Sequence, residues 1–271
     1  MKVAIHTLVS YLIFLALVGV SGDGNSAGAS LLITLIAAIA AVIYILKVAT
    51  HIQFRRIDYL IISAVLVVQV LIGITHFLFI INPAYFAKPD GVSSLLDGTY
   101  YFDIVYFAYL IDLVAELKAN EGYFSVEPIN GVVNKNYFLA YLVSDLFYLG
   151  GSHLLNYTAI NVLSVIYSAV LLSAISLKLF GDISAQQRRM VFYITILHPL
   201  AWIPSHTMRD MFGAFIVILS VALVLFSNTQ VKKNLLGMLG ILLVFQHRSA
   251  YALSMFGTLA VNSGLFRLRN G

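Results

Sequence analysis

Eight long runs of apolar residues constrain the fold of this chain more than any other feature. A helix of about 20 mostly apolar residues can cross the hydrocarbon core of a bilayer with all its backbone hydrogen bonds satisfied internally. The runs therefore predict an all-α integral membrane fold with about eight transmembrane helices, some of them short. They cover residues 3–20, 30–48, 59–81, 157–179, 190–204, 210–227, 234–246 and 250–266.

The composition agrees with this prediction and argues against a water-soluble fold. Hydrophobic residues make up 61% of the chain and charged residues only 10%, whereas a soluble domain carries roughly 25% charged residues. The absence of cysteine excludes a disulfide framework, a thiolate metal site and a cysteine nucleophile. The formal net charge of +4 comes from basic residues scattered at the ends of the apolar runs, so we predict no nucleic-acid partner.

The first run, residues 3–20, leaves two interpretations open. It follows Met1 and Lys2 and precedes the small residues 26–29, which fits a cleaved signal peptide as well as a membrane span. Its apolar stretch is longer than the roughly 7–15 residues of a signal-peptide core. We therefore favour a retained span.

The segment 136–149 is apolar but short, and the positions of the basic residues indicate whether it crosses the membrane. If it does not cross, eleven Lys and Arg residues lie on the cytoplasmic side and five on the outer side; if it crosses, the split becomes six to ten. Membrane proteins place their excess of Lys and Arg in the cytoplasm. We therefore predict that 136–149 is a re-entrant or interfacial helix and that both termini are cytoplasmic. The predicted cytoplasmic residues are Lys2, Lys47, Arg55, Arg56, Lys178, Arg188, Arg189, Lys232, Lys233, Arg267 and Arg269.

We predict that residues 1–271 form a single polytopic membrane domain. Its one long loop is the connection 82–156, which lies on the outer side. A loop of this length in a compact protein is usually functional. It is rich in tyrosine, which anchors helices at the membrane surface, but aromatic rings beside carboxylates also suit a sugar-binding site. Its acidic residues are Asp90, Asp97, Asp103, Asp112, Glu116, Glu121, Glu127 and Asp145.

Asp97 lies at the start of a predicted helix, shortly before Tyr100 and Tyr101. One interpretation makes it a first-turn carboxylate that caps the helix and complements its dipole. The other makes it a reactive group, and both interpretations stay open. Asp103 falls between the two, whereas Asp112 has a like charge one turn away and is predicted to lie on a solvated face.

Two further polar clusters lie far along the chain, at 204–210 and 246–249. Each has a structural interpretation, because arginines at helix ends often reach the membrane surface and Arg209 has Asp210 beside it as an ion-pair partner. The predicted topology nevertheless puts both clusters on the side of the acidic loop. Arginines with histidines at helix ends suit the binding of a diphosphate, and we favour this interpretation for His206, Arg209, His247 and Arg248.

The histidines do not show the spacing of a metal site. We therefore predict no metal and no other cofactor; a divalent cation has no support in the sequence. His198, which precedes Pro199 within the predicted span 190–204, is interpreted as a hydrogen-bonded structural histidine.

Several of these motifs resemble those of known families. The sequence Asp97-Gly-Thr-Tyr-Tyr resembles the acidic first-loop signature of polyprenyl-phosphate-dependent membrane glycosyltransferases of the GT-C type. Residues 141–151 with Asn161 are similar to the amphipathic segment and adjoining helix of that group. Residues 204–210 and 247–250 resemble motifs of the related bacterial polymerases of O-antigen and exopolysaccharide. The chain differs in having Gly98 where the signature has a second acid, and in having fewer spans than most members.

The resemblance implies a site for glycosyl transfer in the inner (cytoplasmic) membrane. Asp97 would be the general base that deprotonates an acceptor hydroxyl, with Asp103 as the second candidate catalytic carboxylate. Arg209, Arg248 and His247 would bind the leaving (di)phosphate of a polyprenyl-linked sugar donor. The remaining candidate substrate-binding residues are Tyr100, Tyr101, His206 and Asp210.

Several functions stay open at this point. The transfer is either the addition of one sugar or the polymerisation of lipid-linked repeat units. From another class, the chain is a lipid-linked sugar flippase, a non-catalytic membrane subunit or an inhibitor of a polymerase. The predicted spans hold almost no ionisable residues, which argues against ion-coupled transport. Membrane lipids are expected partners in every case, and no oligomeric state is predicted.

Overall fold

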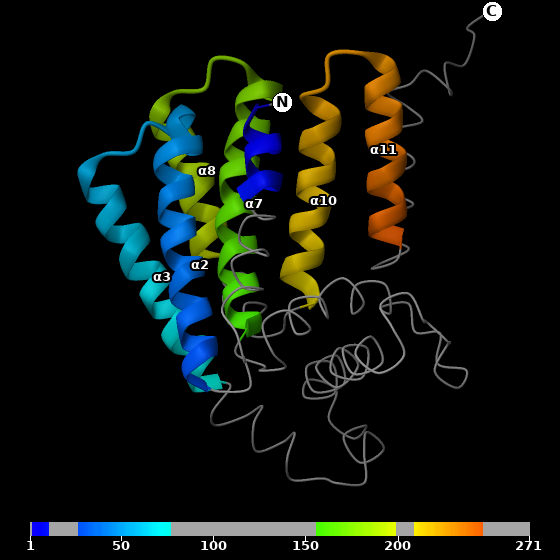
Figure 1. The fold of residues 1–271 in the computed structure, drawn as a ribbon. Coiled ribbons are helices and arrows are strands. Elements are labelled where there is room, and N and C mark those ends of the chain that lie inside the picture. Colours follow the sequence, from blue (N-terminus) through cyan, green and yellow to red (C-terminus); the bar gives the residue numbers. More distant parts are fainter. Residues whose placement is uncertain (1, 11–26, 77–155, 199–208, 246–271) are drawn as a thin grey trace, which may run out of the picture.

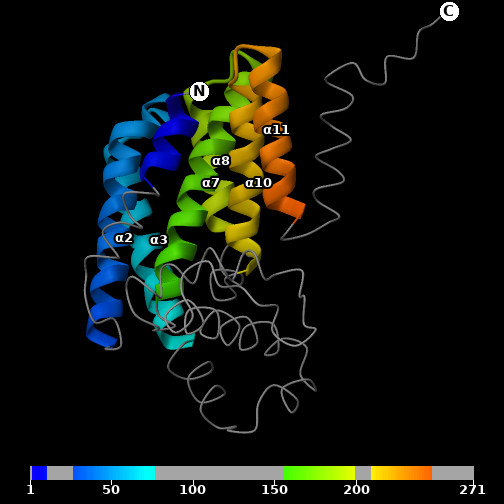
Figure 2. The same cartoon turned by 45° about the vertical axis from the view of Figure 1, so that its right-hand side comes forward.

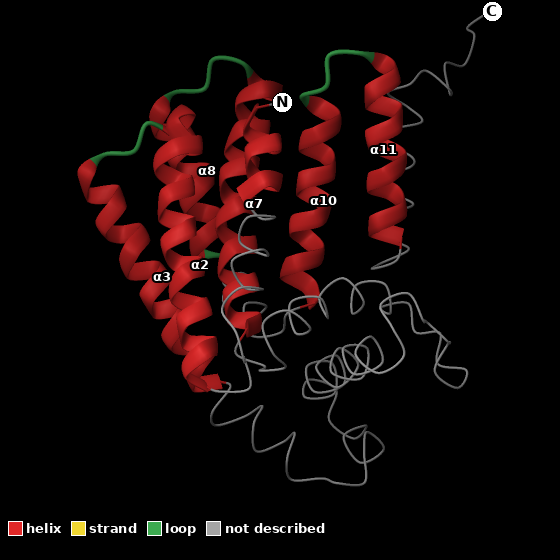
Figure 3. Cartoon of the chain, in the orientation of Figure 1, coloured by secondary structure: helices red, strands yellow, loops and turns green. Residues whose placement is uncertain are grey.

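The computed structural model describes residues 2–10, 27–76, 156–198 and 209–245, and within these ranges the chain is helical and has no strand (Figure 3). The all-α prediction is therefore confirmed for this part of the chain. Besides a helical segment over residues 2–10, the elements are α2 (Ala27–Val48), the 3-10 helix η1 (Ala49–Ile52), α3 (Arg56–His76), α7 (Asn156–Phe180), α8 (Ala185–Leu197), α10 (Arg209–Leu225) and α11 (Gln230–Phe245) (Figure 1).

Six of the eight predicted spans correspond to these helices; 3–20 is described only to residue 10, and 250–266 lies outside the described residues. Among the described helices, one stretch, Asn161–Phe180, is long and apolar enough to cross a membrane by itself, and it is mostly buried among its neighbours. The shorter apolar stretches are Ile39–Ile52 and Met211–Leu225. The number of spans therefore stays a prediction.

The helix found at the predicted span 190–204 has different boundaries, and residues 199–204 lie outside the described residues. Helix α8 begins at Ala185, where Ser184 and Gln187 form a capping box: the Gln187 amide donates to Ser184 Oγ at 3.2 Å and the Ser184 amide to Gln187 Oε1 at 2.7 Å. The helix ends at Leu197, since a residue before proline is driven out of the helical region. His198, with φ −61° and ψ 132°, is thus the exposed C-cap of α8 and not a residue inside the helix.

Helix α7 is the centre of the bundle, because residues 161–171 are buried on every side. It packs against α2, α3, α8 and α10. The Tyr167 ring lies 4.3 Å from that of Tyr44 and 5.9 Å from that of Phe215, joining three helices. The Tyr167 hydroxyl also shares a hydrogen bond of 2.6 Å with Ser10, so the N-terminal helical segment packs on α7 as well.

The outward faces of the peripheral helices are apolar. Large apolar side chains exposed on several neighbouring helices are typical of surfaces that meet lipid or a partner. The exposed apolar side chains include Ile39, Ile43 and Leu46 on α2, Leu60, Val67 and Leu71 on α3, and Val231, Leu235, Met238, Leu239 and Leu242 on α11. Those of α11 recur along one helical face.

The helices alternate in direction, so three connections lie at one end of the bundle (Figure 1 and Figure 2). Connections 49–55, 181–184 and 226–229 lie there, as does the start of the segment 2–10. Nine of the ten described Lys and Arg residues lie at or within a few residues of these connections, with only Asp58 and Asp182 as acids. We call this the basic end. Helices α3, α8 and α11 run away from it, and α2, α7 and α10 run towards it.

Candidate functional site

Most of the predicted site residues lie outside the described residues. Arg209 and Asp210 are the exceptions, and they form the first turn of α10, far from the basic end. The described ranges therefore bring no two of the predicted side chains together in a defined geometry. The residues outside are Asp97, Tyr100, Tyr101, Asp103, His206, His247 and Arg248.

The three segments that carry these residues are nevertheless joined to the same side of the bundle. Segment 77–155 follows α3 and precedes α7, 199–208 joins α8 to α10, and 246–271 follows α11. Since α3, α8 and α11 run away from the basic end and α7 and α10 run back towards it, all three segments leave the side opposite the basic end. Segment 77–155 thus begins and ends on one side of the bundle, as it must if 136–149 within it does not cross the membrane. That segment lies outside the described residues, and its interpretation stays a prediction.

The best-defined polar site of the described residues lies at the basic end and centres on the buried carboxylate of Asp58. The Arg55 backbone amide donates to Asp58 Oδ2 at 2.5 Å, which caps the start of α3. The Tyr193 hydroxyl of α8 donates to Asp58 Oδ1 at 2.5 Å. The Asp58 carboxylate therefore caps the N-terminus of α3 and joins this helix to α8.

Arg189 completes this cluster from α8. Its Nε lies 4.0 Å from Asp58 Oδ2, and its Nη1 donates to the Gln53 carbonyl oxygen at 2.8 Å. Gln53 has φ +57°, a left-handed backbone conformation that few residues other than glycine adopt. The arginine thus binds the turn between α2 and α3 as well as the start of α3.

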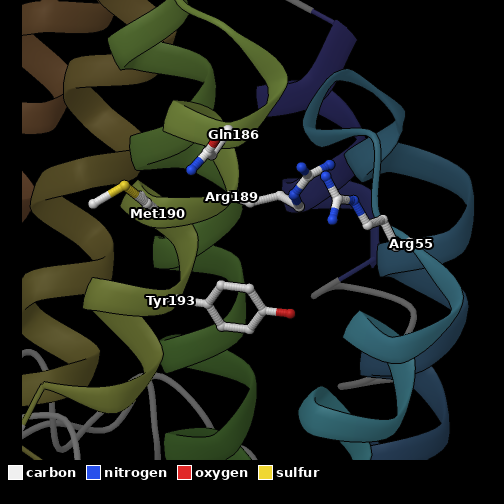
Figure 4. Close-up of a pocket in the computed structure, with 5 residues that line it drawn as sticks. All are labelled: Arg55, Gln186, Arg189, Met190 and Tyr193. Carbon is white, nitrogen blue, oxygen red and sulfur yellow. The ribbon is translucent and has the colours of Figure 1, made fainter.

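An open pocket of about 370 Å³ adjoins the cluster between α8 and the start of α3. Arg55 and Arg189 extend towards each other from its two walls, and the Tyr193 hydroxyl points towards α3 (Figure 4). Gln186 and Met190 complete the lining. Among the described residues Arg189 faces one carboxylate, that of Asp58, and the exposed Arg55 side chain forms no ion pair. The pocket therefore has an excess of positive charge.

His51 of η1 lies near this end with both ring nitrogens buried and without a hydrogen-bond partner. Loss of hydration on burial lowers the pKa of His51, and the nearby Arg188 charge lowers it further. Backbone groups of Val170 and Val48 act in the opposite direction, but neither is a hydrogen-bond partner of the ring nitrogens. The folded protein therefore favours the neutral ring.

We expect this histidine to make the fold less stable in mild acid. Because its pKa is lower in the folded state, the unfolded chain binds a proton first as the pH falls through about 6.5, and the free energy of unfolding decreases. Replacing His51 with leucine should remove this contribution. The measurement is unfolding by SDS titration at about pH 7.5 and pH 5.5. An unchanged difference between the two pH values in His51→Leu would contradict the expectation.

This site was not predicted from the sequence, because Arg55 and Arg189 were interpreted only as indicators of topology. The available signal was Asp58, an acid in the first turn of an apolar run and three residues after Arg55. No group of three or more His, Asp or Glu side chains suited to a metal occurs in the described ranges. No protein family, curated protein or solved structure matches this chain. The family resemblance of its short motifs therefore stays a prediction.

Proposed function

We propose that the chain is a multi-pass membrane protein that transfers a sugar from a polyprenyl-(di)phosphate-linked donor on the outer leaflet, in the assembly of a cell-surface polysaccharide. One observation carries this proposal. The three segments that hold the predicted catalytic and substrate-binding residues all join the bundle on the side away from the basic end. A composite site built from these segments is therefore sterically reasonable.

The distribution of charge supports the orientation. Nine of the ten described Lys and Arg residues cluster at the basic end, and the positive-inside rule assigns such an end to the cytoplasm. The opposite side, where α10 begins with Arg209 and Asp210, then faces outward. The exposed apolar side chains of α2, α3 and α11 provide the surface that lipid would cover.

The proposed chemistry follows from the residue types. Asp97 removes the proton of the acceptor hydroxyl as that oxygen attacks the anomeric carbon of the donor. The bond between the anomeric carbon and the phosphate oxygen breaks, and the electron pair goes to the leaving (di)phosphate. Arg209 and Arg248, with His247, neutralise this developing charge.

The orientation can be tested by labelling because the chain has no cysteine of its own. Asn228→Cys, in the exposed connection between α10 and α11, should react with a membrane-impermeant maleimide only after the cells are permeabilised. Ser94→Cys, in the acidic loop, should react in intact spheroplasts. Labelling of Asn228→Cys from outside would reverse the proposed orientation and remove the proposed outer site.

The activity is tested by mass spectrometry of polyprenyl-linked glycans from cells with and without the gene. Loss of one sugar step supports a single-sugar transferase, and loss of a length series supports a repeat-unit polymerase. Unchanged glycans contradict both. Accumulation of an unaltered lipid-linked precursor on the inner leaflet would instead identify a flippase.

A further inference from the structure

We propose that the pocket between α8 and the start of α3 binds a phosphate group of an anionic membrane lipid. This site lies at the basic end, at the opposite side of the bundle from the proposed transfer site; it rests on the proposed membrane location and orientation but not on the proposed sugar transfer. It is defined by Arg55 and Arg189, with Gln186, Met190 and Tyr193 as the rest of its lining.

The charges at the pocket favour an anion. Within the described ranges Asp58 is the one carboxylate in contact with the side chains of the pocket, and it already accepts hydrogen bonds from the Arg55 backbone amide and the Tyr193 hydroxyl. It offsets at most one of the two guanidinium charges. The Arg55 side chain is exposed and has no ion pair among the described residues. A phosphate between the two side chains would accept hydrogen bonds from both, the recognition for which planar guanidinium groups are suited.

One of the two arginines is already held in place. Arg189 is bound to the Gln53 carbonyl oxygen at 2.8 Å and lies 4.0 Å from the Asp58 carboxylate, with its side chain 12% exposed. Binding therefore requires little further ordering of Arg189, which lowers the entropic cost. Only Arg55 has to adopt a fixed conformation. The pocket volume of about 370 Å³ is enough for a phosphate headgroup.

The surroundings favour a lipid over a soluble phosphate compound. Met190 lines the pocket, and Ile194 and Leu197 continue from it along α8 towards the opposite end, all of them exposed. On α3, which begins beside the pocket, Ile57 and Leu60 are also exposed, at 56% and 68%. An anionic lipid would thus place its phosphate between the arginines and an acyl chain along Met190, Ile194 and Leu197 of α8. Basic pockets between helices at the cytoplasmic surface are suited to such headgroups.

The test compares two neighbouring arginines of equal charge. Arg55 lines the pocket, whereas Arg56 is exposed at the first position of α3 and does not. The full-length protein, purified in a neutral detergent, is titrated with phosphatidylglycerol or phosphatidylcholine and analysed by native mass spectrometry. We expect Arg55→Gln to weaken phosphatidylglycerol binding about tenfold and Arg56→Gln less than about twofold. Phosphatidylcholine, whose headgroup has no net charge, should bind more weakly to the wild type.

Two further arms identify the ligand and exclude misfolding. Excess inorganic phosphate should leave the bound phosphatidylglycerol in place. If phosphate displaced it fully, and if the protein bound the two lipids equally well, the ligand would be a soluble phosphate compound and not a lipid. Arg55→Lys keeps the charge and should retain binding better than Arg55→Gln while unfolding like the wild type. Equal losses in Arg55→Gln and Arg56→Gln, or no loss in Arg55→Gln, would overturn the proposal.

Discussion

Replacing Asp58 with alanine should lower the free energy of unfolding by about 3 kcal/mol, the largest effect on stability expected for a single change in the described residues. The substitution removes the cap of α3 and leaves the Tyr193 hydroxyl and the Arg189 guanidinium without their buried acceptor. Unfolding in SDS, followed by circular dichroism, measures the change. Asp182→Ala is the matched control, since this exposed aspartate lies at the same end and should cost less than about 0.5 kcal/mol.

A double-mutant cycle separates the contributions of the cluster. Tyr193→Phe removes one hydrogen bond to a charged group and should cost about 1.5 kcal/mol. In the Asp58→Ala background the same change should cost far less, because the hydroxyl has already lost its acceptor. Equal costs of Tyr193→Phe in both backgrounds, or equal costs of Asp58→Ala and Asp182→Ala, would show that the cluster does not hold α3 to α8.

If Asp97 is the general base of the proposed transfer, replacing it with asparagine should lower sugar transfer by at least about 100-fold, the usual effect of removing such a group. Asparagine is chosen because it caps a helix as well as aspartate does. The substitution therefore preserves the structural role that the sequence also allows for Asp97 and removes only the basic carboxylate. The measurement is transfer to the lipid-linked product in membranes that contain equal amounts of inserted protein.

Asp112→Asn is the matched control for this experiment. It changes the same chemical group in the same acidic loop but lies on the predicted solvated face, so transfer should stay within about twofold of the wild type. Asp103→Asn tests the second candidate carboxylate in the same assay. Full transfer by Asp97→Asn would remove Asp97 as the base and leave helix capping as its role.

The helices of this fold could largely be predicted from the sequence. A long apolar run favours a helix, because a helix satisfies the backbone hydrogen bonds of the run internally. Helices α2, α7 and α10 begin and end within a few residues of the predicted spans. Helix α8 was predicted less well, since Gln186 to Arg189 near its start are polar and were assigned to a loop. The capping pair of Ser184 and Gln187 and the proline after His198 were the local signals of its true boundaries.

The site at the basic end could not be predicted in the same way. Tyr193 and Asp58 are 135 residues apart in the chain, and Arg189 and Gln53 are 136 apart. Apolar periodicity indicates which segments are helices but not which polar side chains meet across two of them. A count of arginines by side of the membrane also gives every arginine the same weight, although Arg189 is engaged in the fold and Arg55 is exposed.

The separation in sequence also determines the order in which the two hydrogen-bond partners are synthesised. The ribosome completes α3 long before it makes α8, so the Asp58 carboxylate is synthesised 135 residues ahead of the Tyr193 hydroxyl that it binds. Asp58 Oδ2 can accept from the Arg55 amide as soon as α3 forms, but Oδ1 has to keep water as its partner during that interval. In the proposed membrane protein, an unsatisfied charge would be too costly in hydrocarbon. The start of α3 would therefore stay at the membrane surface until α8 docks, and closure of this pair of helices would be a late step in biogenesis.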